Sequence, residues 1–432
     1  MHTTILGKAG KFNIGCRAER LTAHAGIVLL RDFIERLGVP ELLDENLHLK
    51  QRERGYPESE NILSLCWNSL LGGTCLLDLD VLRSDPGLPE LLGVKSVLAP
   101  TTAGEFLRAF TMGDLCNLQR VTRELAQRMR PHQKSTRVTI DLDASLYEQC
   151  STRKQGSRQH YQGQIGYYPL FAFWAEEKEL LATHLLRGNA HASPKAVWVL
   201  QQALRQAPSD VPLYLRADSE FYTWGLLDFC ADHHITYAIT ADQSPGLRQA
   251  LTEVPDKAWK FYAPGLQVAD VWYAPCGHAT QRYVAKRQLR FHRKTRQAQW
   301  RYHVVITNDH TRSAKKVMTW ALGRCTVENK IKEHKTDFGL EKMPTQNFHA
   351  NWAWLLIGQL AWNLLAWFNR TCLPPPCHQL MLGTVRHRFL NVVGKIVHRG
   401  RQWFLFLSDQ NCFQDWWVFA LKQLTLFHPI SP

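Results

Sequence analysis

Two aspartates close an apolar run in the stretch Val138–Ser145, which reads Val-Thr-Ile-Asp-Leu-Asp-Ala-Ser. The β-branched and apolar residues ahead of them predict a strand. Because side chains alternate along a strand with a period of two, Asp141 and Asp143 lie on the same face. Two carboxylates at the end of a buried strand repel each other unless they share a proton, a base or a cation. The simplest interpretation is a site for a divalent metal ion, with the two acids equivalent as ligands.

The composition describes a basic globular protein. The 432 residues are too many for one compact core and predict two to four domains. Hydrophobic residues make up 45% of the chain and charged residues 21%, which excludes a disordered chain. The 52 Lys and Arg exceed the 38 Asp and Glu by 14, which favours a polyanionic partner such as nucleic acid.

No targeting or membrane segment is expected. The amino terminus lacks an apolar run of signal-peptide length. The most apolar helix, Ala353–Phe368, is interrupted by Gln359 and Asn363 and is shorter than the roughly 20 residues that cross a bilayer. The eleven cysteines form no Cys-x-x-Cys pair, so free thiols in a reducing cytoplasm are the expectation.

The first 130 residues are predicted to be mostly helical, from the apolar spacing in Ile27–Leu37, Asn61–Leu71 and Asp114–Met129. Between the last two, residues 99–110 predict a short helix that begins at threonine caps and exposes Arg108. This helix could be the second one of a helix-turn-helix motif that enters a major groove, or part of a plain helical bundle.

Strand periodicity begins at Thr136. The order is three strands, a helix, a strand, a helix and a strand, at Val138–Ser145, Tyr167–Ala175, Leu180–Leu186, Lys195–Arg205, Val211–Ala217, Thr223–His233 and Ile235–Thr240. Ser193 and Pro194 are expected to open the first helix as N-cap and N1. This is the order of a ribonuclease-H-like sheet, in which the first and fourth strands are neighbours. In that arrangement Asp218 lies beside Asp141 and Asp143.

A β-rich, basic segment follows at Trp259–Asn308. Its part from Val271 to Asn308 contains no Asp or Glu but carries eight bases: Arg282, Lys286, Arg287, Arg290, Arg293, Lys294, Arg296 and Arg301. Tyr283, Phe291, Trp300 and Tyr302 are interleaved with these bases. Such a pattern is typical of a surface that neutralises phosphates and stacks on exposed bases, although a charge run is more often a solvated face.

Helical periodicity resumes at Ser313. Arg324, Glu328 and Lys335 follow the spacing i, i+4 and i+11, which places them on one helix face. Taken alone, this face is equally consistent with a common ladder of exposed ion pairs. Beyond it, Phe348–Arg370 predicts a buried helix, and a basic tail leads to a strand at Trp403–Leu407.

Three acids stand out for chemistry: Asp143 or Asp141, Asp218 and Glu328. Two carboxylates from adjacent strand ends and one from a helix can bind two Mg²⁺ ions about 4 Å apart, which activate a nucleophile and stabilise the leaving oxygen of a phosphodiester. Mg²⁺ suits few carboxylates because water and substrate phosphate complete its shell. No His-Glu-x-x-His, Gly-x-Gly-x-x-Gly, Walker A or Gly-x-Ser-x-Gly motif points to another chemistry.

These residues resemble an insertion-sequence transposase of the DDE class, in the IS4-like group and closest to the IS1380 family. The resemblance extends over nearly the whole chain and is carried by five short motifs in order, at residues 140–145, 167–173, 186–190, 215–221 and 324–335. Two departures from the group are Ala321 in place of the tyrosine three residues before Arg324, and Ser145 where threonine is usual.

The resemblance implies an α/β fold: a ribonuclease-H-like catalytic core with a β-rich insertion, flanked by a helical N-terminal and a mixed C-terminal region. The expected boundaries are 1–130 for a DNA-binding helical region, 131–244 and 309–345 for the core, 245–308 for the insertion and 346–432 for the C-terminal region. A homodimer that holds double-stranded transposon ends and target DNA, in the cytoplasm of a bacterium at the nucleoid, is also implied.

By position, the resemblance makes Asp143, Asp218 and Glu328 the catalytic and metal-binding triad, with two Mg²⁺ ions that Mn²⁺ can replace. Arg324 and Lys335 are expected to hold phosphates of the transposon end, and the basic insertion supplies Arg287, Arg290, Arg293 and Lys294. The implied reaction nicks DNA with water and joins the freed 3′-hydroxyl to target DNA, most simply by cut-and-paste.

Two rival hypotheses remain open at the level of sequence. Asp141-x-Asp143-x-Ser also resembles the first motif of haloacid-dehalogenase-type phosphatases, in which the first aspartate is the nucleophile and Mg²⁺ is required. That class needs a later acidic cluster, whereas Ser-Glu-Phe-Tyr follows Asp218. The second rival is a transposase-derived DNA-binding protein that no longer cuts.

Overall fold

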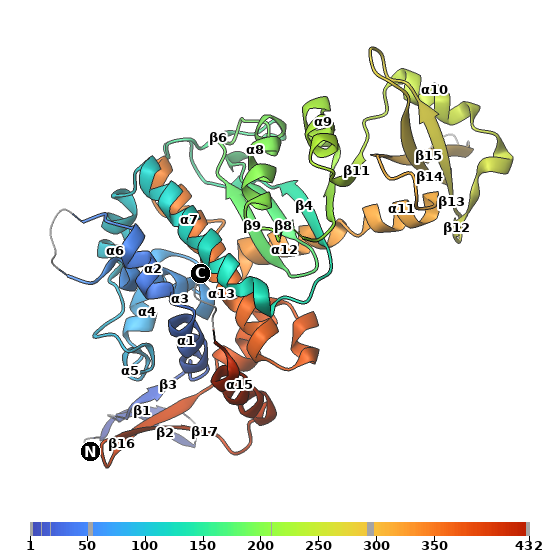
Figure 1. Cartoon of the computed structure of the whole chain (residues 1–432). Helices are drawn as coiled ribbons and strands as arrows, with labels where there is room; N and C mark the ends of the chain where they lie inside the picture. Colours follow the sequence, from blue (N-terminus) through green and yellow to red (C-terminus); the bar gives the residue numbers. More distant parts are fainter. Residues whose placement is uncertain are drawn as a thin grey trace. The chain divides into compact units, whose positions relative to one another are not determined.

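The computed structural model of the chain (Figure 1) describes residues 3–9, 11–17, 19–50, 55–208, 210–291 and 298–428. The chain folds into two compact units. Met1–Pro131 and Glu333–Pro432 form the first, called here the helical unit, and His132–Lys332 form the second, called here the core unit. The helical unit therefore combines segments from both ends of the chain.

The core unit is built on a large mixed sheet. In the described residues it has nine strands in the order β12-β13-β14-β15-β11-β10-β4-β8-β9. Their bounds are β4 Val138–Ala144, β8 Leu170–Trp174, β9 Glu179–His184, β10 Leu213–Ala217, β11 Thr236–Thr240, β12 Lys260–Ala263, β13 Leu266–Tyr273, β14 Gln281–Phe291 and β15 Ala298–Thr307. β10 is parallel to both β4 and β11, and β8 is antiparallel to β4.

The strand and helix order expected from the sequence is confirmed for the large sheet over residues 138–240. Three short strands that were not expected, β5 (Tyr147–Glu148), β6 (Arg158–Gln159) and β7 (Ile165–Tyr167), lie between β4 and β8 in the chain and form a separate sheet. Helix α8 (Ser193–Leu204) follows β9, and helix α9 (Trp224–Asp232) lies between β10 and β11 in the chain. The first strand, β4, and the fourth, β10, are hydrogen-bonded neighbours as expected. β8 is buried throughout and is a continuous apolar run. β4 is also buried through its first six residues, although it alternates apolar residues with Thr139, Asp141 and Asp143.

The β-rich segment after residue 259 does form strands, and these continue the same sheet (Figure 1). β15 pairs antiparallel with β11, the last core strand. At this junction the Thr307 hydroxyl donates to the Tyr237 carbonyl at 2.6 Å, and the hydroxyls of Tyr222 and Tyr283 lie 2.8 Å apart. The insertion is therefore fused to the core through shared sheet hydrogen bonds.

Four further helical segments belong to the core unit, besides the short 3₁₀ helix η4 (Asp256–Ala258). α10 (Pro245–Glu253) precedes the insertion strands, and its N-cap Ser244 accepts a hydrogen bond from the Leu247 amide. α11 (Ala314–Leu322) begins at the N-cap Ser313 and packs on β13 and β14. α12 (Cys325–Thr336) begins in the core unit, and its last residues belong to the helical unit. The fourth is a short 3₁₀ turn, η3 (Ser219–Phe221), directly after β10.

The helical unit is organised around α13 (Phe348–Cys372), which is buried along almost its whole length. Its neighbours come from the first third of the chain, because α3, α6 and α7 all pack on it. The helices of this unit are α1 Ile27–Arg36, α2 Val39–Asn46, α3 Glu58–Leu71, α4 Leu79–Arg83, α5 Leu88–Leu92, α6 Pro100–Arg108, α7 Met112–Met129, α13, α14 Leu382–Val385 and α15 Gln414–Leu426.

Strands also occur in the helical unit, in addition to the helices that the sequence predicts for most of its first 130 residues. β1 (Thr3–Ala9) and β2 (Phe12–Arg17) form an antiparallel pair, and β3 (Leu21–Thr22) joins β16 (Gly394–Arg399) and β17 (Gln402–Leu407) in a small sheet. The side chains described in β1 and β2 are all exposed, so the hairpin carries no core pattern that would reveal it in the sequence.

Two predicted helix starts are also corrected. The helix at residues 99–110 is present as α6, but its N-cap is Ala99 with no side-chain hydrogen bond, and the threonines lie within the helix. Likewise α8 begins at Ser193, and its N-cap is Ala192. In both cases a proline in the first turn fixes the helical φ angle, so a side-chain cap is not needed to start the helix.

None of the helices in the described residues is by itself long and apolar enough to cross a membrane. One bent pair, Glu58–Leu71 with Leu76–Arg83, passes the same test by length and composition, with a 94° bend between its halves.

The hydroxyl pair between core and insertion gives a testable stability prediction. Tyr283 is fully buried, so Tyr283→Phe leaves the Tyr222 hydroxyl without its partner and should lower the free energy of unfolding by about 1 kcal/mol. Urea denaturation measures the change, and Tyr161→Phe, at a position 71% exposed, serves as the control. The double variant with Tyr222→Phe should cost less than the sum of the single changes; strict additivity would show that the hydroxyls do not interact.

Candidate active site

Asp143 and Asp218 end two neighbouring parallel strands. The register of β4 and β10 pairs Leu142 with Ala217, so the next residue of each strand is one of the two acids. Asp143 is 7% exposed and accepts a hydrogen bond from the Ala144 amide at 3.0 Å. Parallel strands thus bring two carboxylates to one edge of the sheet.

The loop after β10 holds Asp218 in place. Its carboxylate caps η3 and accepts a hydrogen bond from the Glu220 amide at 3.0 Å. Glu220 is anchored in turn, because its carboxylate accepts from the Tyr168 hydroxyl at 2.6 Å and from the Ala192 amide at 2.8 Å. Two of the motifs that carry the family resemblance, at residues 167–173 and 215–221, therefore meet around the second acid.

Arg324 brings the third acid to the other two. It lies between α11 and α12, and its guanidinium contacts Asp143 Oδ2 at 3.2 Å and Glu328 Oε1 at 3.4 Å. Its charge also acts on Asp218. The interpretation of this helix face as an isolated ladder of surface ion pairs is therefore wrong, since the ladder ends on a buried aspartate.

Burial and mutual repulsion shift the acids toward their neutral forms. Desolvation raises the pKa of Asp143 to about 7, and the charges of Asp218 and Glu328 add to this against the opposing attraction of Arg324. Desolvation likewise raises the pKa of Asp218. Such a cluster gains most from a strong positive charge placed among the carboxylates.

The structure separates Asp141 from Asp143, which the strand period alone could not do. Asp141 is 0% exposed, and both of its carboxylate oxygens are held by Arg216 of β10, at 2.6 and 2.9 Å. A carboxylate enclosed in this way is available neither as a metal ligand nor as a nucleophile. Of the two acids, Asp143 is the one next to Asp218 and Arg324.

The donor set fits a hard cation such as Mg²⁺, because all three candidate ligands are carboxylates, of which Asp143 is buried and Asp218 half-buried. In the arrangement described, however, no three Asp, Glu, His or Cys side chains of the described residues converge closely enough to hold a metal ion. The guanidinium of Arg324 is the cation that lies between Asp143 and Glu328. The Glu328 side chain is 61% exposed. Metal binding therefore requires Glu328 to turn inward and Arg324 to release the acids.

The predicted DNA-binding residues other than Arg324 lie in different surroundings. Lys335 belongs to the helical unit and pairs there with Glu341 at 3.7 Å. Arg287 is enclosed: it lies between the rings of Trp259 and Trp300 and contacts Asp256 at 2.8 Å. Arg290 is exposed on β14, whereas Arg293 and Lys294 lie outside the described residues.

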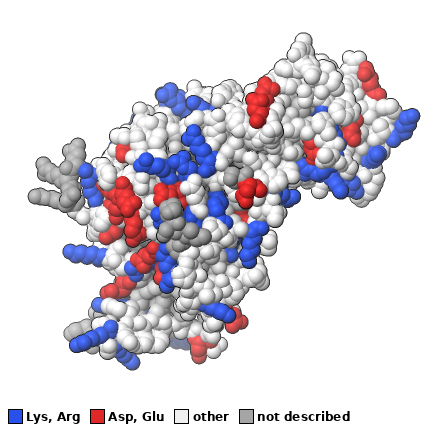
Figure 2. Space-filling model, in the orientation of Figure 1, with Lys and Arg blue, Asp and Glu red and all other residues white. Residues whose placement is uncertain are grey.

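Counter-acids for the basic segment come from neighbouring parts of the chain. Asp270 of β13 pairs with Arg282 at 2.7 Å, and Asp256 pairs with Arg287. Figure 2 shows Lys and Arg side chains gathered along one edge of the insertion, at the right of the view, with acidic side chains on the same face. A count of charges within residues 271–308 alone therefore overestimates the unpaired positive charge of the insertion.

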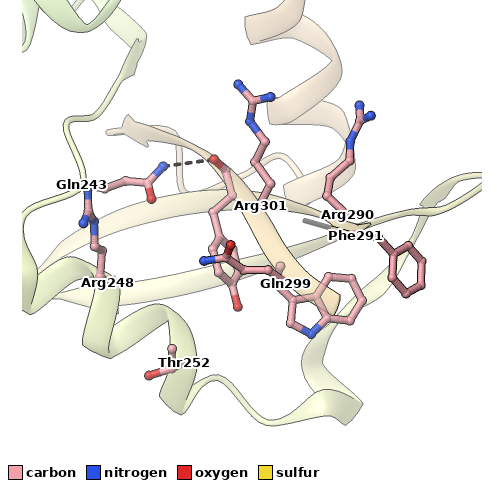
Figure 3. Close-up of a pocket in the computed structure, with 9 residues that line it drawn as sticks. Gln243, Arg248, Thr252, Arg290, Phe291, Gln299 and Arg301 are labelled. Carbon is pink, nitrogen blue, oxygen red and sulfur yellow. Dashed lines mark hydrogen bonds between the residues drawn. The ribbon is translucent and has the colours of Figure 1, made fainter. Parts of the chain in front are cut away.

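A cavity of about 960 Å³ opens on the insertion. Its lining contains three arginines, two glutamines, a threonine and three aromatic rings: Arg248, Arg290, Arg301, Gln243, Gln299, Thr252, Phe291, Trp300 and Tyr302. Figure 3 shows the guanidinium groups of Arg290 and Arg301 extending in the same direction, with the Gln243 amide bonded to the Tyr302 carbonyl. None of the described residues that line this cavity is acidic, so it suits an anionic ligand.

Two residues of the site escaped the sequence analysis. Arg216 and Glu220 each stand two positions from Asp218, in Arg-Ala-Asp-Ser-Glu. The signal for Arg216 was its spacing, because Asp141-x-Asp143 and Arg216-x-Asp218 on adjacent parallel strands place an acid opposite a base. Glu220 gives no comparable signal, because its partners lie in distant loops.

Comparisons with known proteins identify a family and a solved structure to which the chain is similar. A family model for the transposase DDE domain, group 1, matches residues 7–428. Among solved structures, a piggyBac transposase synaptic complex with hairpin DNA aligns with 84% of this chain and 79% of its own, at 9% identity and a TM-score of 0.45. No curated protein matches the chain.

The family match covers nearly the whole chain, so the class is that of the DDE transposases. The chain belongs to the family of the transposase DDE domain, group 1.

The raised pKa of Asp143 predicts how pH affects stability without metal. Between the ordinary aspartate pKa of about 4 and the folded value of about 7, the folded state binds the extra proton, so the free energy of unfolding falls as pH rises through this window. Asp143→Asn removes the free-energy cost of ionising this buried carboxyl group. Its melting temperature in chelator should exceed that of the unmodified protein at pH 8, by roughly 2–4 °C for each kcal/mol recovered, and approach it near pH 4.

The matched control is Asp80→Asn, at an aspartate whose side chain is 63% exposed. That variant should melt like the unmodified protein at both pH values. A melting temperature for Asp143→Asn below that of the unmodified protein at pH 8 would show that the Arg324 contact outweighs desolvation.

Proposed function

We propose that the protein is a Mg²⁺-dependent transposase that cleaves DNA at the ends of an insertion sequence and joins them to target DNA. The observation that carries the proposal is that Arg324 contacts both Asp143 and Glu328, while Asp218 ends the strand next to that of Asp143 and is attracted by the charge of the same arginine. Family membership supports the same reaction class. The strand order β9-β8-β4-β10-β11 supports a ribonuclease-H-like core.

In this proposal Asp143, Asp218 and Glu328 hold two Mg²⁺ ions. When bound, the ions activate a water or a 3′-hydroxyl and stabilise the leaving oxygen of the phosphodiester. The buried strand ends fix Asp143 and Asp218, whereas exposed Glu328 can move. Arg324, once released from the acids, is placed to contact a DNA phosphate with its planar donor set.

The finer assignments are proposals of the same kind. They comprise membership of the IS1380 family, the domain boundaries, a cut-and-paste reaction carried out by a homodimer, and a bacterial cytoplasmic location at the nucleoid. For Lys335 we keep the role of a phosphate contact, and we add Arg248 and Arg301 of the insertion cavity to Arg290 as candidate DNA contacts.

The burial of Asp141 argues against the phosphatase hypothesis. That reaction needs an exposed nucleophilic aspartate, and both oxygens of Asp141 are bound by Arg216 inside the sheet. The hypothesis of a protein that binds DNA without cutting differs only in turnover, so activity measurements separate it from the transposase.

A strand-transfer assay with DNA that carries the element's own ends tests the proposal. Asp143→Asn, Asp218→Asn and Glu328→Gln should each lower cleavage by at least about a thousandfold, because each removes a ligand of ions that contribute several kcal/mol to the transition state. Binding of end DNA, measured by gel shift, should persist. Full activity in all three variants would refute the site, and an inactive unmodified protein that still binds its ends would favour the non-cutting alternative.

The insertion cavity gives a separate prediction about DNA affinity. Arg290→Ala and Arg301→Ala should each weaken end binding and lower the slope of log affinity against log salt by about 1, as expected for one lost phosphate contact. Arg205→Ala, on an exposed surface of α8, is the control. An unchanged salt slope in both cavity variants would remove the cavity from the DNA interface.

A further inference from the structure

A buried ion pair lies beneath the three acids and is not itself part of the triad. Asp141 of β4 and Arg216 of β10 are register partners, with exposures of 0% and 7%. The Nε atom of Arg216 donates to one carboxylate oxygen at 2.6 Å and an Nη atom donates to the other at 2.9 Å. This bidentate geometry fixes the plane of the guanidinium.

The third nitrogen of the same guanidinium reaches a third segment. Arg216 Nη1 donates to the backbone carbonyl of Trp320 at 2.9 Å, in the last turn of α11. Gly323, which ends α11, lies so close that a Cβ atom there would collide with Arg216 Nη1. The turn between α11 and α12 therefore contacts the ion pair directly through Arg216.

Each of these contacting residues lies only a few positions in the sequence from one of the three candidate acids. Asp141 precedes Asp143 by two residues, and Arg216 precedes Asp218 by two. Gly323 directly precedes Arg324, and Glu328 follows in the first turn of α12. One guanidinium thus ties together the three segments that carry the acids.

We propose that the Asp141–Arg216 ion pair is a positioning device that sets where Arg324 and Glu328 meet Asp143 and Asp218. The inference deepens the proposed function and rests on it, since it concerns the geometry of the same metal site. Neither residue touches DNA or metal in this scheme, so both act through the α11–α12 turn.

Stability alone does not explain a charged pair at this position. Removing an aspartate and an arginine from water costs several kcal/mol per ion, and an apolar pair of similar size often stabilises a core as well or better. What an apolar pair cannot supply is a directed third hydrogen bond, which here reaches the Trp320 carbonyl.

Lys330 adds a second link between α12 and the same strand. It is 8% exposed, its ammonium lies 5.6 Å from the centre of the Phe173 ring, and it attracts Asp141 electrostatically. Its Nζ has no hydrogen-bond partner in the described part of the chain. The carboxylate of Asp141 therefore faces cations from both β10 and α12.

The first test replaces the pair with apolar residues, as Asp141→Leu/Arg216→Met. The control is Asp270→Leu/Arg282→Met, which removes another Asp–Arg pair of the same sheet whose arginine also donates to backbone carbonyls, at Asp309 and Arg312. Mn²⁺ affinity is measured by electron paramagnetic resonance without DNA, melting temperature by calorimetry, and cleavage as a function of Mn²⁺ concentration.

The pair variant should bind Mn²⁺ about 10- to 100-fold more weakly than the unmodified protein, as is usual when residues that orient metal ligands are lost. Its cleavage should recover partly at high Mn²⁺, its end-DNA binding should remain, and its melting temperature should stay within a few degrees. The control pair should leave Mn²⁺ affinity unchanged. Equal Mn²⁺ affinity in the pair variant and the unmodified protein would overturn the inference.

Gly323→Ala provides a second test that does not depend on folding of the pair variant. Gly323 has φ −58° and ψ −16°, a helical conformation that alanine adopts easily, so the substitution adds no backbone strain and acts only through the collision with Arg216. The added Cβ should push the turn away from Arg216, lower Mn²⁺ affinity several-fold and lower the melting temperature by no more than a few degrees. Unaltered Mn²⁺ affinity would contradict the positioning role.

The two proposals fail in different ways. If the unmodified protein binds no Mn²⁺, or binds it equally after Asp143→Asn, the metal site of the proposed function is wrong. If Asp143→Asn abolishes binding while the pair and Gly323 variants bind normally, only the positioning role is wrong.

Discussion

The site depends on the repulsion between carboxylates that the sheet forces together. The parallel register of β4 and β10 places Asp143 and Asp218 side by side at the ends of the two strands. Burial raises the pKa of both carboxyl groups. A cation must offset this cost for the charged forms to persist. Arg324 supplies one, and it also brings Glu328 to the cluster. In the proposed function, the same electrostatic need that holds the arginine in place favours a divalent ion among the acids.

Much of the core could be predicted from the sequence, because its strands and helices carry clear periodic patterns. The order from β4 to β11 was predicted, and with it the approach of Asp218 to Asp143. The choice between Asp141 and Asp143 could not follow from the strand alone, because both acids share a face. It required the partner strand, whose Arg216 binds only the first of them.

Other features depend on contacts between distant segments and left no local pattern. The exposed β1–β2 hairpin has no buried face, and the junction of β15 with β11 joins residues about 70 positions apart. In the insertion, the run of bases predicted a free positive surface, but Arg282 and Arg287 are paired with acids outside that run. Charge counted along the sequence therefore differs from charge exposed on the fold.

The central claim is that Asp143, Asp218 and Glu328 surround one metal site. Fe²⁺ bound in place of Mg²⁺ generates hydroxyl radicals on addition of peroxide and ascorbate, and these cut the backbone next to the ion. Mass spectrometry of the fragments should show cuts clustered near residues 143, 218 and 328, which excess Mg²⁺ suppresses. Cuts at only one of these positions, or cuts elsewhere that Mg²⁺ suppresses equally, would contradict a site shared by the three acids.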